Sequence, residues 1–308
     1  MISAEQTHRL ITRLDFDGFV AAVLLRERKL LEEIKFVHPK DVQDGLISLS
    51  SRDITTGVPY QPDVALSFTH RATDVPVPAP ENLIAVAEAS SSARVVYEYF
   101  GGEAAFPEID EGMVEAADRA GSATFSRKEV LQPEDWNLLN FILDSRTGLG
   151  RFKNFRISTY QLMLELIEFA EGHTILEIMA LNDVAERVRL YFEHQELFQE
   201  QILAVGRMAG SVLVVDLRSQ EEIFAGNRFI KYALYPEANV SIQIAWGFRG
   251  QNTVITVGKS IFNRTLTADV GSIMARYGGS GHSAAGTCQV ENGDVDQVVE
   301  DIRKQFLH

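Results

Sequence analysis

Two aspartates separated by one residue are the first side chains whose types and spacing suggest chemistry. Asp15 and Asp17, in the stretch RLDFDG, follow an apolar run and precede an apolar helical pattern. Gly18 permits a tight turn between the predicted strand and the predicted helix. Carboxylates at this spacing beyond a strand can bind a hard divalent cation, or one ion of a metal pair. The alternative is that one acid caps the helix and the other is solvated.

Two further stretches add candidate ligands to this pair. Asp53, in RDITTGVPY, is either a third carboxylate at a second strand end or a turn former beside two threonines, and the turn is favoured. The apolar run VALSF ends at Thr69-His70-Arg71, which places a hydroxyl, an imidazole and a guanidinium side by side. Buried strands often deliver chemical groups at their carboxyl ends.

A glycine-rich stretch near the C-terminus has the composition of an anion-binding loop. GGSGHSAAG contains Gly278, Gly279, Gly281 and His282, so that exposed backbone amides and one imidazole can meet a phosphate or a nucleobase. The alternative is a tightly packed loop with a buried histidine.

A second glycine-containing stretch, DSRTGLGRF, offers Arg146 and Arg151 around two glycines. Either this stretch faces a ligand cleft or it is a structural turn with solvated arginines. The residues leave both alternatives open.

Composition restricts the classes of partner. With 308 residues, two domains are expected, and a net charge of −14 argues against a protein that coats long nucleic acid. No apolar stretch approaches the ~20 residues that span a bilayer. A single cysteine, Cys288, excludes an internal disulfide, and the N-terminus lacks a secretory pattern, so we expect a cytoplasmic protein.

Strand and helix patterns divide the chain into three parts. The first alternates short apolar strands with helices and predicts a mostly parallel sheet covered on both faces, with strands over 8–15, 33–39, 63–68 and 82–88 and helices over 18–33 and 90–102. The second is helical over 156–172 and 175–208. The third predicts an antiparallel sheet with strands over 211–217, 228–236, 240–248 and 253–261 and helices over 269–279 and 294–307.

This order predicts an α/β protein with a parallel-sheet N-terminal domain (1–155), a helical connector (156–208) and a smaller α+β C-terminal domain (209–308). A cleft between two domains is the natural place for a ligand.

The motifs RLDFDGFVAAVLL, DITTGVPY, SARVVYEYFGG, ILDSRTGLGRF and GKSIFNRT…VGSIMARYGGSGHSAAGTCQV follow one another in an order that resembles the DHH/DHHA1 phosphoesterase superfamily. The chain is most similar to the branch of exopolyphosphatase-related proteins and oligoribonuclease-type or cyclic-nucleotide-type phosphodiesterases. The resemblance covers nearly the whole chain. It implies an N-terminal domain that holds two manganese ions and a C-terminal domain that grips the substrate.

The resemblance also implies that several metal ligands are missing here. Asp15 and Asp17 match the first motif of the family and Asp53 the second, but the Asp-His-His triplet falls on Thr69-His70-Arg71. A later aspartate, usually within a stretch similar to DKADSA, falls on Gly121 of DRAGSA, where Asp118 keeps only an earlier acid.

Two-metal hydrolysis needs ions ~3.5–4 Å apart, and a neutral hydroxyl, a permanent cation and a glycine cannot hold them. Arg71 is therefore expected to replace a metal among the carboxylates, or to bind a phosphate; the alternative is a solvated side chain.

The C-terminal motifs show less change. Asn263, Arg264 and His282 match positions that the resemblance assigns to substrate binding, together with Gly278, Gly279 and Gly281. Ser280 stands where a third consecutive glycine is usual. A serine that needs a positive φ would be mildly strained.

Two functions remain after this comparison. The first is a degenerate phosphoesterase-like protein, a pseudoenzyme that binds a nucleotide or another small phosphate ligand and needs no cofactor; a chain kept only for partner binding belongs with this alternative. The second is a slow phosphodiesterase or phosphatase that holds one weakly bound Mn²⁺ or Mg²⁺ on Asp15, Asp17, Asp53 and His70 and acts on short oligonucleotides, small nucleotides or polyphosphate. The expected partner is a small phosphate-containing ligand or a short oligonucleotide, with no membrane and a possible homodimer.

Overall fold

The structure is a computed structural model that describes residues 6–71, 75, 77–152 and 155–306. The chain folds into two compact units. The first contains residues up to Phe125 together with Pro133–Leu190, and the second contains Ser126–Gln132 and Tyr191–His308. The first unit ends within one long helix, and the expected boundaries at 155 and 208 stay predictions.

A five-stranded parallel sheet forms the centre of the first unit. Its strands stand in the order β2-β1-β3-β4-β5. Their bounds are β1 (His8–Thr12), β2 (Leu31–Phe36), β3 (Asp53–Thr56), β4 (Leu66–Thr69) and β5 (Leu83–Ala85). The expected α/β architecture with a parallel sheet is confirmed. The strand β3 was expected as a turn, because its sequence DITT is polar; all four of its residues are buried in the middle of the sheet.

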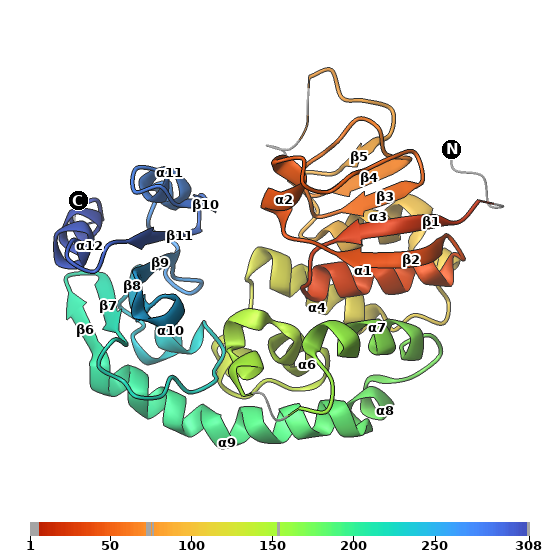
Figure 1. The fold of residues 1–308 in the computed structure, drawn as a ribbon. Coiled ribbons are helices and arrows are strands. Elements are labelled where there is room, and N and C mark those ends of the chain that lie inside the picture. Colours follow the sequence, from red (N-terminus) through yellow and green to blue (C-terminus); the bar gives the residue numbers. More distant parts are fainter. Residues whose placement is uncertain (1–5, 72–74, 76, 153–154, 307–308) are drawn as a thin grey trace. The chain divides into compact units, whose positions relative to one another are not determined.

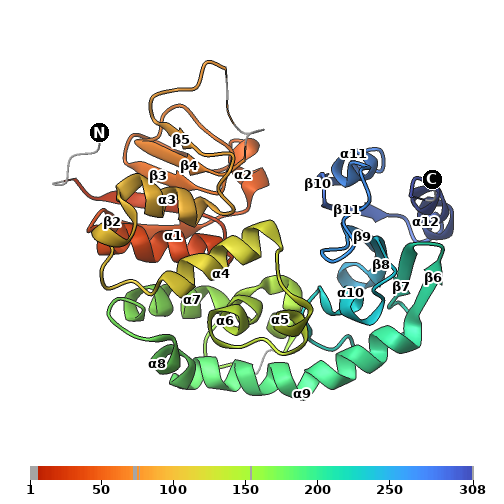
Figure 2. The same ribbon diagram turned by 180° about the vertical axis from the view of Figure 1, so that it is seen from behind.

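Helices cover both faces of this sheet. Leu10 of β1 belongs to the main core with α1 (Phe16–Glu27), α3 (Ser92–Phe100) and α4 (Glu111–Ser122), whereas the next residue, Ile11, packs with Val42 of α2 (Pro39–Gln43). Figures 1 and 2, which view the protein from opposite sides, show α2 and α3 on opposite faces of the sheet. The unit also contains α6 (Asp135–Leu143), α7 (Thr159–Phe169) and α8 (Ile175–Ala180).

The second unit is built on a six-stranded mixed sheet in the order β10-β11-β9-β8-β7-β6. Its strands are β6 (Gly206–Ala209), β7 (Val212–Asp216), β8 (Val240–Trp246), β9 (Thr253–Lys259), β10 (Ser280–His282) and β11 (Ala285–Val290). The expectation of a purely antiparallel sheet is wrong, because β7 and β8 are parallel. Parallel neighbours need a crossover connection, and this one contains α10 (Ile230–Leu234), a helix where a strand over 228–236 was expected.

The other helices of this unit are α5 (Arg127–Leu131), α11 (Val270–Ala275) and α12 (Val295–Lys304). The last two pack their apolar side chains on one face of the sheet, against residues such as Ile242 and Val257. The long helix α9 (Asn182–Val205) contributes residues to both units. No helix in the described ranges is both long and apolar enough to cross a membrane.

Candidate functional site

The first motif aspartate, Asp15, is held by two neighbours directly after β1. Its carboxylate caps α1 by accepting a hydrogen bond from the amide of Gly18 at 3.0 Å, and its other oxygen lies 2.9 Å from Nε of Arg13. The turn requires glycine at position 18, because a Cβ there would lie 2.2 Å from the carbonyl oxygen of Arg13. Both oxygens of Asp15 therefore have protein partners.

The second motif aspartate, Asp17, binds the N-terminus of another helix. Its two oxygens accept hydrogen bonds from the backbone amides of Ala93 at 2.7 Å and Ser92 at 3.1 Å, in the first turn of α3. A carboxylate is favourable there because the first amides of a helix lack partners within the helix. Burial, reinforced by the negative charge of Asp15, raises the pKa of the Asp17 carboxyl; the nearby His70 and the two amides offset this only in part.

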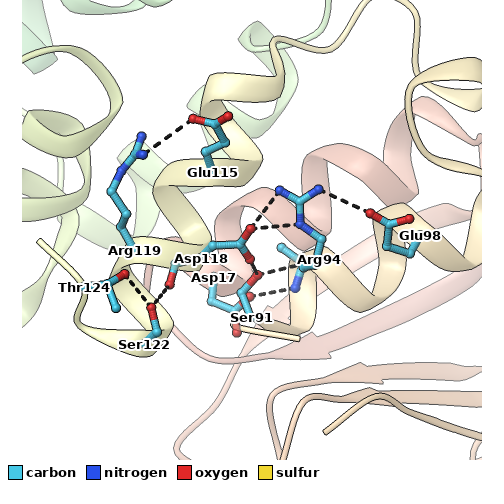
Figure 3. A network of polar contacts seen from close by, with 10 residues as sticks. Asp17, Ser91, Arg94, Glu98, Glu115, Asp118, Arg119, Ser122 and Thr124 are labelled. Carbon is cyan, nitrogen blue, oxygen red and sulfur yellow. Dashed lines mark hydrogen bonds and ion pairs between the residues drawn. The ribbon is translucent and has the colours of Figure 1, made fainter. Parts of the chain in front are cut away.

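An ion pair between α3 and α4 fixes the same helix end. Asp118 accepts hydrogen bonds from Oγ of Ser91 at 2.7 Å and from Nε of Arg94 at 2.8 Å. Ser91 in turn caps α3 by accepting the amide of Arg94 at 3.0 Å. Figure 3 shows this network beside Asp17. Asp118 is thus committed to a structural contact.

The triplet Thr69-His70-Arg71 lies at the carboxyl end of β4, as the sequence suggested. Thr69 is buried and accepts the amide of Arg71 at 3.1 Å, while Nδ1 of His70 lies 3.0 Å from Oγ of Ser92. His70 therefore joins Asp17 at the start of α3. In the described ranges the side chain of Arg71 forms no ion pair, and the guanidinium that pairs with a motif carboxylate is that of Arg13.

Gly121 allows α4 to approach the loop before α3 closely. A Cβ on Gly121 would lie 2.1 Å from the carbonyl oxygen of Ser90, a distance at which the backbone must shift. The position that the family resemblance assigns to an acid has no room for a side chain in this packing.

Asp53 lies far from the other motif acids. It is the first residue of β3, at the amino end of the sheet, and pairs with Arg9, which is also its neighbour in the β1–β3 register. The distance from its Oδ1 to Nε of Arg9 is 2.6 Å, and its Oδ2 accepts the amide of Ser50 at 2.7 Å. The expectation that Asp53 follows a strand end is wrong, and the residue at the carboxyl end of β3 is Thr56.

These contacts decide how well the residues fit a metal pair. The resemblance implies two manganese ions, but the oxygens of Asp15 and Asp17 are bound to amides and to a guanidinium, and Nδ1 of His70 contacts a hydroxyl. Within the described ranges, no group of three or more His, Cys, Asp or Glu side chains is placed to hold a metal ion. The arrangement does not fit a two-metal site.

The stretch DSRTGLGRF forms two short 3₁₀ turns, Ser145–Thr147 and Leu149–Arg151. Arg146 pairs with Asp144 at 2.7 Å and its side chain is 53% exposed. The partial burial of Arg146 would lower the pKa of its guanidinium, but the carboxylates of Asp144 and Asp15 outweigh this and raise it. Arg146 therefore lies within electrostatic reach of Asp15. Arg151 instead covers Gly148, where a Cβ would meet its guanidinium at 2.2 Å.

In the second unit, the glycine-rich stretch is a β-hairpin rather than a loop. The strands β10 and β11 pair Ser280 with Thr287 and His282 with Ala285. The residue in the left-handed region is Gly278 (φ 71), whereas Ser280 is a strand residue without a positive φ and carries no such strain. Gly279 and Gly281 lack side chains because a Cβ on each would lie 2.3 Å from a carbonyl oxygen of β11.

The other residues expected to bind substrate, Asn263, Arg264 and His282, belong to the same unit as this hairpin, and each side chain has a local hydrogen bond. Nδ1 of His282 accepts the amide of Ala284 at 3.3 Å, and Nε of Arg264 donates to the carbonyl oxygen of Ile261 at 3.1 Å. Oδ1 of Asn263 accepts the hydroxyl of Thr265 at 2.9 Å. Asn263 and Arg264 lie between β9 and α11, and His282 is exposed on β10.

Sequence reasoning missed three residues of the first-unit site. Arg13 was overlooked although it stands two residues before Asp15, directly after β1. Ser91 and Ser92 were identified only as a helix start. The signal that could have found them is the serine cap itself, because a capped helix N-terminus is a place where a carboxylate or a phosphate binds.

Three comparisons with known proteins bear on this arrangement. No family model matches the chain. A curated relative, the A-adding tRNA nucleotidyltransferase of Aquifex aeolicus, is 28% identical over 189 residues, which are 58% of this chain and 20% of that protein. The chain thus matches about a fifth of the length of this relative.

Two of the solved structures that are similar to this chain also match over nearly their own full length. The pGpG-specific phosphodiesterase PggH from Vibrio cholerae is 48% identical, covers 97% of this chain and 98% of its own, and has a TM-score of 0.85. CDC45 from Entamoeba histolytica is 8% identical, with coverages of 97% and 95% and a TM-score of 0.50, and shares the fold alone. On the full-length match to PggH and the two-unit architecture, the chain belongs to the DHH/DHHA1 phosphoesterase superfamily.

Proposed function

We propose that this protein binds a short phosphorylated nucleotide and has lost the two-metal hydrolysis of its superfamily. The observation that carries the proposal is that the carboxylates of Asp15 and Asp17 are occupied by partners within the protein. Each oxygen of these two carboxylates is engaged by a backbone amide or by the guanidinium of Arg13. Two ions at ~3.5–4 Å would need several of these oxygens as ligands, together with the acids that Thr69 and Gly121 replace.

Arginines supply the positive charge that a phosphate ligand needs. Arg13 and Arg71 follow the carboxyl ends of β1 and β4, and Arg146 lies within electrostatic reach of Asp15. A guanidinium binds phosphate in a bidentate manner and keeps its charge at any physiological pH. Arg13 is paired with Asp15 and Arg146 with Asp144, so a bound phosphate would exchange with these carboxylates. In a chain of net charge −14, a few such cations favour one small anion over a long nucleic acid.

The class of ligand follows from the relative PggH, whose name identifies pGpG as its substrate. Identity of 48% over the full length supports a ligand of the same size and chemistry, a linear dinucleotide with a 5′-phosphate. We therefore take pGpG as the first probe. The cytoplasmic location and the homodimer remain predictions.

A second candidate function is slow hydrolysis of the same dinucleotide with one divalent ion. The name of PggH as a phosphodiesterase favours it. Asp15, Asp17 and His70 would hold the ion after exchanging their present partners, and Asp53 would take no part because it lies at the other end of β3. A single ion would neutralise charge on the scissile phosphate without the second ion's alignment of the attacking oxygen.

Calorimetric titration of pGpG into metal-stripped protein tests the proposal. We expect saturable binding in EDTA, an affinity that changes little on addition of Mn²⁺, and no conversion to GMP on chromatography of the same sample. Arg264→Ala and His282→Ala are expected to weaken binding, whereas the exposed Arg52→Ala, at the amino end of the first sheet, serves as the control. Binding that requires Mn²⁺ and is followed by release of GMP would favour the single-ion enzyme.

A further inference from the structure

One face of the second sheet carries a row of polar side chains in register. Gln243 of β8 pairs with Thr256 of β9, Thr256 with Thr287 of β11, and Thr287 with Ser280 of β10. The hydroxyl oxygens of the two threonines are 3.4 Å apart. This polar row lies on the face opposite α11 and α12, because the residues that alternate with it, such as Val257 and Ile242, form the core beneath those helices.

A buried lysine stands at the inner end of the polar row. Lys231 of α10 is 8% exposed, and its Nζ lies 3.4 Å from Oε1 of Gln243. The next residue, Tyr232, holds α10 against the sheet through hydrogen bonds to Oγ of Ser241 at 2.8 Å and to the carbonyl oxygen of Gly258 at 2.6 Å. Exposure rises along the row, from the half-buried Gln243 to the exposed Ser280.

The ammonium of Lys231 lies 5.6 Å from the ring centroid of Tyr232 and near the amide of Gln243, but no carboxylate of the described residues balances its charge. Throughout the described ranges no carboxylate forms an ion pair with its Nζ, although the chain has 43 acidic residues. Arg228, another cation, is the charged neighbour that acts on it. Burial, reinforced by Arg228, lowers the pKa of Lys231 to about 8. An ammonium placed in such surroundings is costly unless an anion joins it.

The neighbouring row brings a motif residue to the same face. Ser241, Gly258, Ala285 and His282 pair in register across β8, β9, β11 and β10. Three of these residues are small, and the fourth is the histidine of the glycine-rich motif. With Lys231 of α10, the two rows present an ammonium, an imidazole, hydroxyls and an amide, and these residues include no carboxylate. This set of groups is suited to a phosphate.

We propose that Lys231, Gln243 and Thr256 form a phosphate subsite on this face, which takes the terminal 5′-phosphate of the nucleotide. The proposal deepens the proposed function and rests on it for the class of ligand. Lys231 supplies the charge, and the amide and hydroxyl of Gln243 and Thr256 donate hydrogen bonds. The exposed end of the row at Thr287 and Ser280 leaves room for the remainder of the nucleotide to continue toward His282.

The test compares pGpG with GpG, which lacks the 5′-phosphate, by calorimetry on the full chain. Wild-type protein should bind pGpG on the order of 10- to 100-fold more tightly than GpG, as charge-assisted contacts to one phosphate allow. Lys231→Met should remove this preference by weakening pGpG alone. Lys304→Met, on α12 beneath the opposite face, is the matched control and should keep the preference.

The outcomes separate the subsite from the proposed function. The subsite is overturned if the Lys231→Met variant keeps the preference for pGpG, or if its affinities for pGpG and GpG fall equally. In both cases the binding of nucleotide by wild-type protein still supports the proposed function. If wild-type protein binds neither dinucleotide, the proposed function fails, and inorganic pyrophosphate decides the subsite alone. Pyrophosphate binding that is present in wild-type protein and absent in Lys231→Met supports it; equal or absent binding in both overturns it.

Discussion

The carboxylate of Asp17 accepts a hydrogen bond from the backbone amide of Ala93 at 2.7 Å, across 76 residues of sequence. This contact ties the first turn of α1 to the first turn of α3. A residue that matches a metal ligand of the superfamily thus stabilises a helix end. The resemblance implies that Thr69, Arg71 and Gly121 stand at metal positions of the family, and Asp15 and Asp17 have protein partners in this structure.

Asp17→Ala should destabilise the first unit even without metal. Removal of the carboxylate leaves the amides of Ser92 and Ala93 without their partner, and loss of such a cap costs about 1–2 kcal/mol of the free energy of unfolding. Urea unfolding in EDTA measures the change, with the exposed Asp63→Ala as control. If the variant is as stable as wild-type protein in EDTA but less stable than wild-type protein in Mn²⁺, Asp17 is a metal ligand instead.

Gly121→Asp should fail to rebuild a metal site. A Cβ at this position meets the carbonyl oxygen of Ser90 at 2.1 Å, and overpacking of this kind costs about 1–3 kcal/mol. Gly121→Ala carries the same Cβ without the acid and should be destabilised to a similar degree in thermal unfolding. The triple variant Thr69→Asp, Arg71→His, Gly121→Asp is therefore expected to bind Mn²⁺ poorly. Wild-type stability together with Mn²⁺-dependent hydrolysis in that variant would contradict the packing argument.

Asp53→Asn should reduce stability and leave ligand affinity unchanged. The carboxylate is buried and pairs with Arg9, whose side chain is 27% exposed, so that removal of the negative charge costs about 2–3 kcal/mol, less than for a fully buried pair. Urea unfolding and pGpG titration on the same variant separate the two effects. A tenfold loss of affinity in a fully folded variant would return Asp53 to the site.

Lys231→Met should stabilise the protein at pH 7. The pKa of this lysine is about 8 in the folded chain and 10.5 as its ordinary value, so the unfolded chain binds more protons between these pH values. The stability of wild-type protein therefore rises as pH increases through this window, and below it the buried charge costs up to about 3 kcal/mol. Methionine removes that cost, and urea unfolding at pH 7 and pH 9.5 should show the difference shrinking with pH. A destabilised variant at pH 7 would mean that Lys231 is structural.

Much of the fold followed from the sequence. Apolar runs predicted β1, β4, β5, β7, β8 and β9, and serine and glycine caps predicted α3, whose C-cap Gly101 has φ 112. The residues that led to wrong predictions are those whose environment is tertiary. DITT of β3 is polar in composition but lies in a central strand, and the segment around Lys231 alternates like a strand but forms the crossover helix α10.

The site was predictable only in part for the same reason. The types of Asp15, Asp17 and His70 and their positions beyond strand ends could be inferred from the sequence. The sequence could not show that α3 begins beside Asp17, that Arg13 rather than Arg71 pairs with Asp15, or that Asp53 starts its strand. Each of these depends on strand order and register, which a single sequence does not determine.

The central claim, that ligand binding survives without two-metal hydrolysis, is tested most directly by a single-turnover assay. Protein in excess over pGpG, saturated with Mn²⁺, is quenched over hours and analysed for GMP, after calorimetry has shown the ligand to be bound. We expect bound pGpG to remain intact over the whole time course. Stoichiometric conversion to GMP at a rate that depends on Mn²⁺ concentration would contradict the account.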